Sequence, residues 1–534
     1  MKNHVETLLQ ADENIEPWID IYGNNARPFV HKFQTKNNKY LLDVNTNEIL
    51  KVDNVVWDII DNFDDQNKPQ THTKYITKYG KDKINTAYIN IAQFRQKNNM
   101  LLSKYPQIIF PYSKERAAAK LKENRKQLIL NVTENCNFRC SYCTFSSEYG
   151  TWRNHSKRNM TWEVAKAAID DFLVCDKESS EIKKTEKEPK VLSFYGGEPL
   201  LNFPLIKKSV EYTQKKAKSE NFLFVITTNG YLLKGEIADF LISKKFLITV
   251  SLDGPPEIHN RNRVTINGSG TWEIVVNNLK NIIQKYPLHN KECPIQINAV
   301  LTPSADAFEI ENYFSTCDFL HPSESLQMRL MAEPMPGYFD NLDFEERAPE
   351  GYSLLYENFI KNLAAGRINS NPNSREFSVQ RALFENPYIL IHKRYRANPV
   401  SLPQTASPLS TCLAGEQKTF VSVDGDYYPC EKVPELDNFK IGNVWNGIDV
   451  ARSYELVGNF FKYNKKQCKY CWCVNLCGIG CYINVSDKFQ LTEGAKKNSC
   501  AHFRKALHSR LINYCSILEK DPHAFDYLKD VKIS

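Results

Sequence analysis

Three cysteines stand within eight positions of the stretch ENCNFRCSYCTF, residues 134–145: Cys136, Cys140 and Cys143. Thiolates on one short loop can converge on a metal centre. A structural zinc site needs four protein ligands, and the next histidine, His155, lies beyond the usual ligand spacing. Iron–sulfur clusters also take four ligands. Unless these are a zinc knuckle or incidental buried cysteines, three thiolates would leave one iron of a four-iron cluster open to a small molecule.

Three more stretches place polar residues directly after predicted strands. They are SFYGGEP at residues 193–199, ITTNG at 226–230 and SLDGPPEIHNRNR at 251–263. Gly196 and Gly197 allow a backbone to approach a ligand closely, and Glu198 can accept a hydrogen bond from an ammonium group. Taken singly, an Asn-Gly or Ser-x-Asp-Gly sequence indicates only a turn. Because ligands bind at the carboxyl ends of parallel strands, four such motifs in succession favour one shared site.

The cysteine motif resembles that of the radical S-adenosylmethionine (SAM) enzymes, C-x3-C-x-aromatic-C, with Tyr142 as the aromatic residue. In that family the open iron of a [4Fe–4S] cluster binds SAM, and one electron cleaves SAM to methionine and a 5′-deoxyadenosyl radical that removes a hydrogen atom from the substrate. The glycine-rich stretch resembles the family's GGE motif, which holds the SAM amino group. The resemblance implies cofactor contacts at Tyr142, Gly196, Gly197, Glu198, Asn229, Ser251 and Arg263.

A second set of cysteines lies near the carboxyl end of the chain. Its members are Cys412, Cys430, Cys468, Cys471, Cys473, Cys477, Cys481 and Cys500. Seven of the eight match, in order, the spacing of the SPASM domain of peptide-modifying radical SAM enzymes, and a zinc ribbon is the alternative. Cys473 is extra to that pattern. Single cysteines in apolar contexts are predicted to be core thiols: Cys175, Cys293, Cys317 and Cys515.

The SPASM resemblance implies two auxiliary [4Fe–4S] clusters, and therefore three clusters and SAM as the cofactors. One auxiliary cluster would be held by Cys468, Cys471, Cys477 and Cys500. The other would be held by Cys412, Cys430 and Cys481. No cysteine lies between Cys412 and Cys430 to complete the second set, so its fourth position is open to a substrate thiolate or is filled by Cys473.

The elements that must position these residues follow from the hydrophobic pattern. Six strands are predicted, at Leu128–Thr133, Lys190–Tyr195, Phe222–Thr227, Leu247–Ser251, Ile295–Leu301 and Gln327–Met331. Helical patterns fill the gaps, as at Thr161–Val174 and Trp272–Lys285. This α/β alternation over residues 125–335 predicts a parallel sheet. With the resemblance, the expected fold is a partial (β/α)6 radical SAM barrel, followed by a linker with a helical bridge at 336–410 and the SPASM domain with a C-terminal helix at 411–534.

Residues 1–115 form a separate predicted domain. Strands at Tyr40–Val44 and Glu48–Val52 flank a turn, Asp53 can cap the next helix, a second helix is expected at Ile84–Lys97, and MLLS, residues 100–103, suggests a short strand. The order is similar to that of a winged helix. Because the domain carries no cluster of catalytic residue types, it is predicted to bind, and it resembles the leader-recognition domain of peptide maturases.

Composition limits the other possibilities. A chain of 534 residues is expected to form two or three domains. Its net charge of +7 is small for this length and no basic block demands nucleic acid. The first residues lack the apolar core of a signal peptide and no stretch of 18 apolar residues occurs, so a cytoplasmic protein without a membrane partner is expected. In that reducing compartment, 15 cysteines favour metal binding over disulfides.

The SPASM resemblance implies a peptide or protein substrate. An anaerobic sulfatase-maturing enzyme, which makes formylglycine, is one alternative, and a non-catalytic iron–sulfur electron-transfer protein is another. The amino-terminal domain favours a maturase of ribosomally made peptides, of the type that joins a cysteine sulfur to carbon in a thioether. Sulfatase maturases resemble one another in a catalytic Asp after the equivalent of Cys430; here Glu431 takes that position and is the candidate base. The expected partners are a precursor peptide with a leader segment and a flavodoxin- or ferredoxin-like electron donor.

Overall fold

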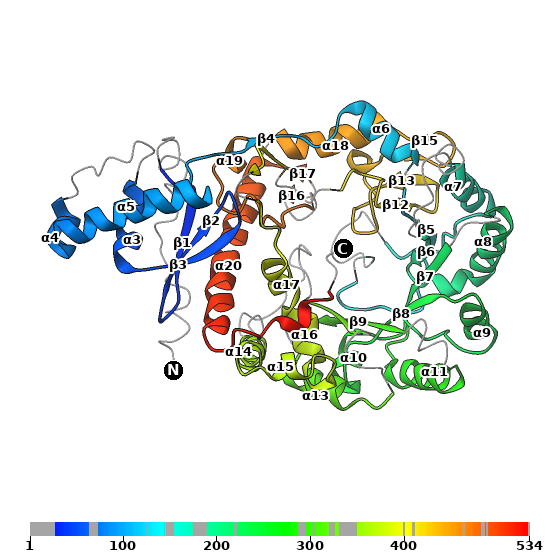
Figure 1. Ribbon diagram of the computed structural model, residues 1–534. Helices are drawn as coiled ribbons and strands as arrows, with labels where there is room; N and C mark the ends of the chain where they lie inside the picture. The colour runs from blue at the N-terminus through cyan, green and yellow to red at the C-terminus, as the bar shows by residue number, and fades with distance from the viewer. Residues whose placement is uncertain are drawn as a thin grey trace.

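The fold is taken from a computed structural model (Figure 1). It describes residues 27–63, 73–123, 125–143, 145, 154–174, 189–217, 222–286, 295–302, 305–319, 326–330, 350–398, 401–407, 412–462, 465–481, 486–487 and 490–531. Among the helices in these ranges, none combines the length and the apolar character that a membrane crossing requires.

A curved parallel sheet makes up the middle part of the chain. Its strands, in spatial as well as chain order, are β5 (Gln127–Thr133), β6 (Lys190–Gly196), β7 (Phe222–Thr228), β8 (Leu247–Ser251), β9 (Gln296–Leu301) and β10 (Leu326–Leu330). All six predicted strands are confirmed to within a residue at each end. Neighbours pair in parallel register, so their carboxyl ends share one rim.

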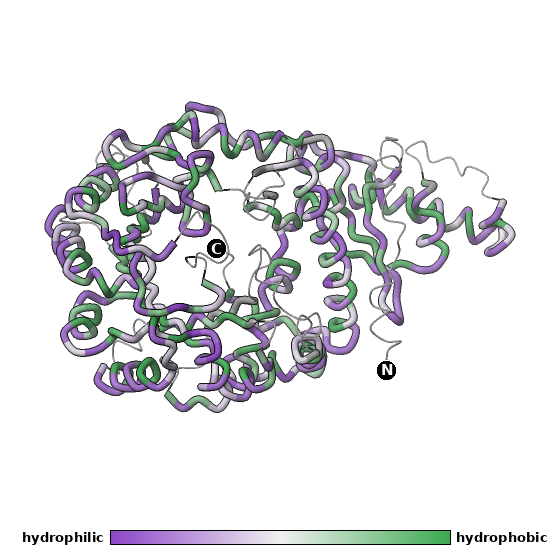
Figure 2. The backbone as a smooth tube through the Cα atoms, turned by 180° about the vertical axis from the view of Figure 1, so that it is seen from behind, coloured by the Kyte–Doolittle hydropathy of each residue, from purple (hydrophilic) through white to green (hydrophobic). Residues whose placement is uncertain are grey.

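Helices cover the outer face of this sheet, as Figure 1 shows. They are α7 (Trp162–Val174), α8 (Phe203–Lys216), α9 (Gly235–Ser243), α11 (Trp272–Lys285) and α13 (Ala307–Thr316). Alternate strand residues such as Leu128, Leu130 and Val132 are buried in the same core as these helices. In Figure 2 the tube through the outer helices changes between green and purple along its length, as expected for helices with one face on the core and one toward water. The predicted partial α/β barrel is therefore the observed fold.

Four strands from the carboxyl-terminal third extend the same sheet. β12 (Lys418–Val421) pairs in parallel with β5, and β13 (Asp426–Tyr428), β14 (Gly442–Asn443) and β15 (Gly447–Ile448) follow in antiparallel order. This pairing was not predicted from the sequence. It makes a ten-stranded sheet and brings the segment that carries Cys430 beside the first barrel strand.

The segment between the barrel and these strands contains more helix than expected. Instead of linkers around a single helix, the structure has α14 (Glu350–Ala364), α15 (Arg367–Ser370), α16 (Ser378–Phe384) and α17 (Asn386–His392). α16 packs on β10 and α13. Buried aromatic side chains, among them Phe377, Phe384 and Tyr388, hold these short helices together.

The amino-terminal region contains a small three-stranded sheet, β1 (Val30–Gln34), β2 (Lys39–Asp43) and β3 (Glu48–Val52), with α3 (Asn54–Ile59), α4 (Thr73–Tyr79) and α5 (Lys81–Asn98). Asp53 caps α3 as predicted, because its carboxylate accepts from the Val56 amide at 2.8 Å. The strand expected at residues 100–103 is wrong: Leu101 has a left-handed φ of 56°. The first strand, β1, was not predicted.

This small domain is docked on the carboxyl-terminal part of the chain. In Figure 1 it lies against α20 (Glu493–Leu518), which β1 contacts. His31 stacks on Trp472 with ring centroids 3.5 Å apart, and the Tyr40 hydroxyl donates to Glu519 at 2.7 Å. The predicted domain of residues 1–115 also includes a strand that belongs to the rest of the molecule, because β4 (Gln107–Ile108) pairs with β11 (Thr405–Ala406). The small domain's own hydrophobic core ends at Leu101.

Candidate active site

The three motif cysteines follow β5 at the carboxyl rim of the barrel. Cys136 is buried, and Cys140 and Cys143 are half-buried. Burial raises the pKa of Cys140 to about 12, although the nearby Arg263 guanidinium opposes this rise. Each thiol also interacts electrostatically with the others, so the loop does bring them together. Three thiols brought together on one loop fit a metal cluster, whose positive charge would stabilise them as thiolates when it binds.

One histidine lies closer to this loop than the sequence suggested. His155 Nε2 is 3.9 Å from the Cys143 sulfur. Burial lowers the pKa of His155 to about 4, so the ring is neutral at physiological pH. Over the described ranges, no three His, Cys, Asp or Glu side chains converge closely enough to share a single metal ion. A four-iron cluster takes one thiolate at each iron and so needs a wider spacing.

Gly196 and Gly197 bring the GGE turn against the cysteine loop. A Cβ atom at Gly196 would lie 2.2 Å from the Thr133 carbonyl oxygen, and one at Gly197 would lie 2.4 Å from that of Asn135. The two turns are joined by a hydrogen bond from the Gly197 amide to Thr133 and another from the Glu198 amide to Asn135, of 2.9 and 2.8 Å. The two glycines were predicted to let a ligand approach the backbone closely. In the structure, the backbone of the cysteine loop itself makes this close approach.

Glu198 ties the second and third strand ends together. Its carboxylate is fully buried and accepts from the Leu200 amide, the Thr228 hydroxyl and the Asn229 amide, at 3.0, 2.7 and 2.7 Å. Burial raises the pKa of Glu198 to about 7, against these hydrogen bonds. The Asn229 side chain donates to Asn137 of the cysteine loop at 2.8 Å. Three predicted contact residues, Gly197, Glu198 and Asn229, thus hold the cysteine loop in place.

Asp253, which was not among the predicted site residues, is the central residue after the fourth strand, β8. Its buried carboxylate accepts from the Tyr142 hydroxyl, from Arg263 Nε at 2.9 Å and from the Val300 amide at 3.0 Å. Arg263 also lies over the Tyr142 ring and 4.0 Å from the Cys140 sulfur. The Tyr142 hydroxyl and Arg263 Nε, on two residues predicted to contact SAM, are therefore engaged with Asp253. The Ser-x-Asp-Gly motif in the sequence could have identified Asp253 as a site residue.

Ser251 lies two residues before Asp253, at the end of β8, and is buried. It pairs across the sheet with Asn298 of β9. The structure therefore gathers all seven predicted cofactor contacts on the same rim as the three cysteines, on the loops after β5, β6, β7 and β8.

The carboxyl-terminal cysteines separate into two groups. Cys468, Cys471, Cys477 and Cys500 interact with one another, whereas Cys481 interacts with Cys412 and Cys430. These are the two sets that the resemblance implied. Cys473 is buried beside Cys471 and Cys477, which places it with the four-cysteine group. Cys317 and Cys515 are buried core thiols, and Cys175 and Cys293 lie outside the described residues.

Glu431, the candidate base, directly follows Cys430 and is largely buried. Its side chain is 18% exposed and pairs with the Lys418 ammonium at 2.8 Å. Burial alone would raise the pKa of Glu431, but the charge and hydrogen bond of Lys418, with a backbone hydrogen bond and the Lys432 charge, together outweigh burial and lower it. A carboxylate with a lowered pKa is a weaker proton acceptor, so Lys418 must move away for Glu431 to act as an efficient base.

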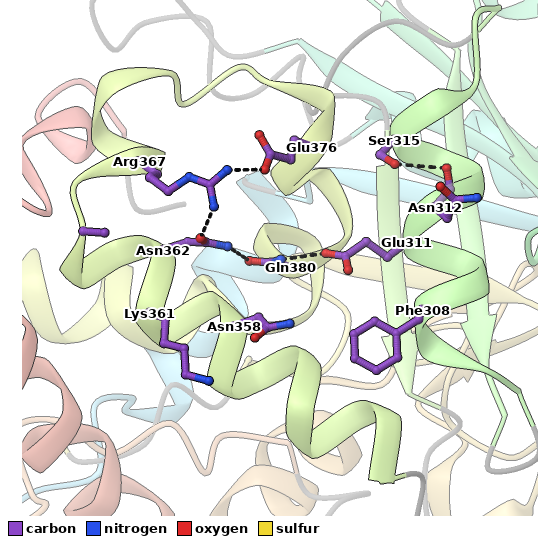
Figure 3. A pocket seen from close by; sticks show the side chains of 11 residues that line it. Phe308, Glu311, Asn312, Ser315, Asn358, Lys361, Asn362, Arg367, Glu376 and Gln380 are labelled. Carbon is purple, nitrogen blue, oxygen red and sulfur yellow. Dashed lines mark hydrogen bonds and ion pairs between the residues drawn. The ribbon is translucent and has the colours of Figure 1, made fainter.

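The large cavity in Figure 3 lies elsewhere, between α13, α14 and α16, and has a volume of about 780 Å³. A chain of polar contacts crosses its wall. Arg367 pairs with Glu376 at 2.6 Å and donates to Asn362 at 2.9 Å, Asn362 donates to Gln380 at 3.1 Å, and Gln380 donates to Glu311 at 2.6 Å. The residues described as lining it include none of the predicted site residues. The rim of the barrel is therefore the better candidate for the active site.

Comparison with known proteins agrees with this geometry. Residues 130–291 match the model of the Radical SAM superfamily. The cysteine-type anaerobic sulfatase-maturating enzyme of Clostridium perfringens strain 13 is 26% identical over 384 residues, which cover 66% of this chain and 88% of the relative. The radical SAM cyclopropyl synthase TigE of Paramaledivibacter caminithermalis is 26% identical over 233 residues, 42% of this chain and 45% of the relative.

Among solved structures, native anSMEcpe with bound AdoMet is similar with a TM-score of 0.49 and 22% sequence identity, over 76% of this chain and 100% of that chain. The family match is the more specific finding, because it spans the cysteine loop and the strand ends that carry Glu198, Ser251 and Arg263. Residues 130–291 of the protein are therefore a radical SAM domain.

Proposed function

We propose that this enzyme modifies a ribosomally made precursor peptide by joining a cysteine sulfur to a carbon atom in a thioether. The observation that carries the proposal is the grouping of the carboxyl-terminal thiols into a set of four and a set of three, on a segment whose strand β12 pairs with the first barrel strand. Three protein thiolates leave the fourth iron of a [4Fe–4S] cluster free to bind a substrate thiolate. The relationship to a sulfatase-maturating enzyme supports a polypeptide substrate.

The residues that would hold the cofactors are those named above. Cys136, Cys140 and Cys143 would bind the cluster at which SAM is cleaved. Two auxiliary [4Fe–4S] clusters would bind to the sets of four and three thiols in the carboxyl-terminal region. When bound, these groups supply the electron that cleaves SAM and the radical that removes a hydrogen atom from the peptide.

The chain's own part is to orient and enclose the reacting groups. The Asp253–Arg263 ion pair is almost fully buried, with side-chain exposures of 0% and 7%, and so holds the Arg263 guanidinium in a fixed position beside Cys140. Glu198, Asn229 and Gly197 fix the cysteine loop against the neighbouring strand ends. Glu431 would accept the thiol proton once Lys418 is displaced.

The proposed reaction balances. One C–H and one S–H bond of the peptide break and one C–S bond forms. The hydrogen atom leaves on 5′-deoxyadenosine, the thiol proton goes to a base, and one electron is released. That electron equals the one consumed when SAM is cleaved, so SAM oxidises the peptide by two electrons overall. If the released electron returns to the cluster that cleaves SAM, the external donor has to supply only the first electron.

The product distinguishes the proposal from sulfatase-type maturation. We expect the modified peptide to lose two hydrogens per crosslink, with one fewer alkylatable thiol per crosslink after reduction. Mass spectrometry of the reduced and alkylated product of a cysteine-rich peptide encoded near the gene measures both values. A disulfide disappears on reduction and a thioether does not. An aldehyde product with no further loss of thiols would contradict thioether formation and support formylglycine formation instead.

The small amino-terminal domain is proposed to bind the leader segment along β3. Within the described residues β3 pairs only with β2, whereas β1, at the other edge, contacts α20. Lys51 of β3 is exposed. An open strand edge can take up a peptide as an additional strand, whose main-chain hydrogen bonds supply the affinity.

Proline substitutions in β3 test this proposal. The amides of adjacent residues point to opposite edges of a strand, so Leu50→Pro and Lys51→Pro each remove a donor from a different edge. We expect the variant that loses the outward amide to bind the precursor about tenfold more weakly, or about 1.4 kcal/mol, with little change in melting temperature. Fluorescence anisotropy with the labelled precursor measures the affinity. Leader binding that is unchanged in both variants would contradict a site on this edge.

A further inference from the structure

Two cations of α20 face the four-cysteine group. Lys496, Cys500 and Arg504 are spaced four residues apart and therefore lie on one face of the helix. Lys496 is 4% exposed, and its ammonium has no hydrogen-bond partner in the described part of the chain. Arg504 Nε is also buried and without a partner there. A buried ammonium is unfavourable unless an anion compensates its charge, so this arrangement requires negative charge beside α20.

The cysteines are the groups that these charges reach. Lys496 interacts electrostatically with Cys468, Cys477 and Cys500. Arg504 interacts in the same way with Cys471 and Cys500. Both cations therefore lie within electrostatic reach of this group.

We propose that Lys496 and Arg504 raise the reduction potential of the auxiliary cluster held by Cys468, Cys471, Cys477 and Cys500, so that this cluster accepts the electron released when the product forms. The inference rests on the cluster assignment of the proposed function. Reduction adds one negative charge to a cluster that four thiolates already make anionic. A fixed positive charge nearby stabilises the reduced form more than the oxidised form, and low exposure keeps water from screening it.

The test is a redox titration, monitored by electron paramagnetic resonance, of the full chain reconstituted anaerobically with iron and sulfide. The parent for this titration is a variant with alanine at Cys136, Cys140 and Cys143, in which only the two auxiliary clusters give a resonance signal. In this parent we expect Lys496→Met and Arg504→Met each to lower the reduced-to-oxidised ratio of one cluster at least tenfold at fixed potential, about 59 mV for a one-electron couple. The other cluster's transition should stay in place.

Charge-conserving and surface variants complete the design. Lys496→Arg and Arg504→Lys should keep the parent potential, because they keep the charge. Lys505→Met removes the same charge from an exposed position on α20 and should change nothing. Full iron content with unchanged potentials in Lys496→Met and Arg504→Met would overturn this inference alone. A parent without auxiliary iron would overturn the cluster assignment and this inference with it.

Discussion

Replacing Cys136, Cys140 and Cys143 together by alanine is expected to abolish SAM cleavage and to remove about a third of the bound iron. The wild-type chain should bind close to twelve irons, on the rule of about four irons per [4Fe–4S] cluster. The three thiols lie together on the barrel rim and are separate from the two carboxyl-terminal groups. Their loss should therefore leave the auxiliary iron in place. Iron analysis and the yield of 5′-deoxyadenosine from reduced protein and SAM measure the two effects.

Cys317→Ala is the matched control, because Cys317 is a buried thiol at the end of α13 and belongs to none of the three groups. It should keep both the iron and the SAM cleavage of the wild type. SAM cleavage that persists in the triple variant would show that the cofactor binds elsewhere. Loss of nearly all iron in the triple variant would contradict independent clusters.

Gly197→Ala is expected to reduce SAM cleavage about a hundredfold or more, although Gly197 carries no chemical group. Its new Cβ would lie 2.4 Å from the Asn135 carbonyl oxygen, which is backbone and cannot rotate away. The loop that begins at Cys136 must then shift, and a displacement of about 1 Å in an active site can cost about a hundredfold in rate. Overpacking of this kind also destabilises a protein by about 1–3 kcal/mol. The 5′-deoxyadenosine yield and the denaturation midpoint measure these losses.

Gly458→Ala controls for the substitution itself. Gly458 lies in α18 (Val450–Lys462) with nothing within 4 Å of its added Cβ. Alanine there should stabilise the helix by about 0.5–1 kcal/mol and leave SAM cleavage unchanged. If Gly197→Ala retained wild-type cleavage, the GGE turn would not be what holds the cysteine loop.

The barrel strands were predictable because each is a short run of apolar residues between turn residues. β5 and β8 are buried except at their first residues. A strand that is buried on both faces is apolar along its length, and such a run can be recognised in the sequence. β1 was missed because His31, Lys32 and Gln34 interrupt its apolar pattern. It is stabilised instead by pairing with β2 and by the packing of His31 on Trp472, a contact between residues far apart in the chain.

The sequence by itself determined which residues could bind metal and which strand ends carry them, because thiol chemistry and hydrophobic periodicity are local properties. Only the tertiary structure decided which of these residues meet. It engaged Tyr142 and Arg263 with Asp253, assigned Cys473 to the four-cysteine group, and placed Lys496 of α20 beside that group. Such contacts depend on how helices and strands distant in sequence pack, and nothing in the spacing of the residues encodes that packing.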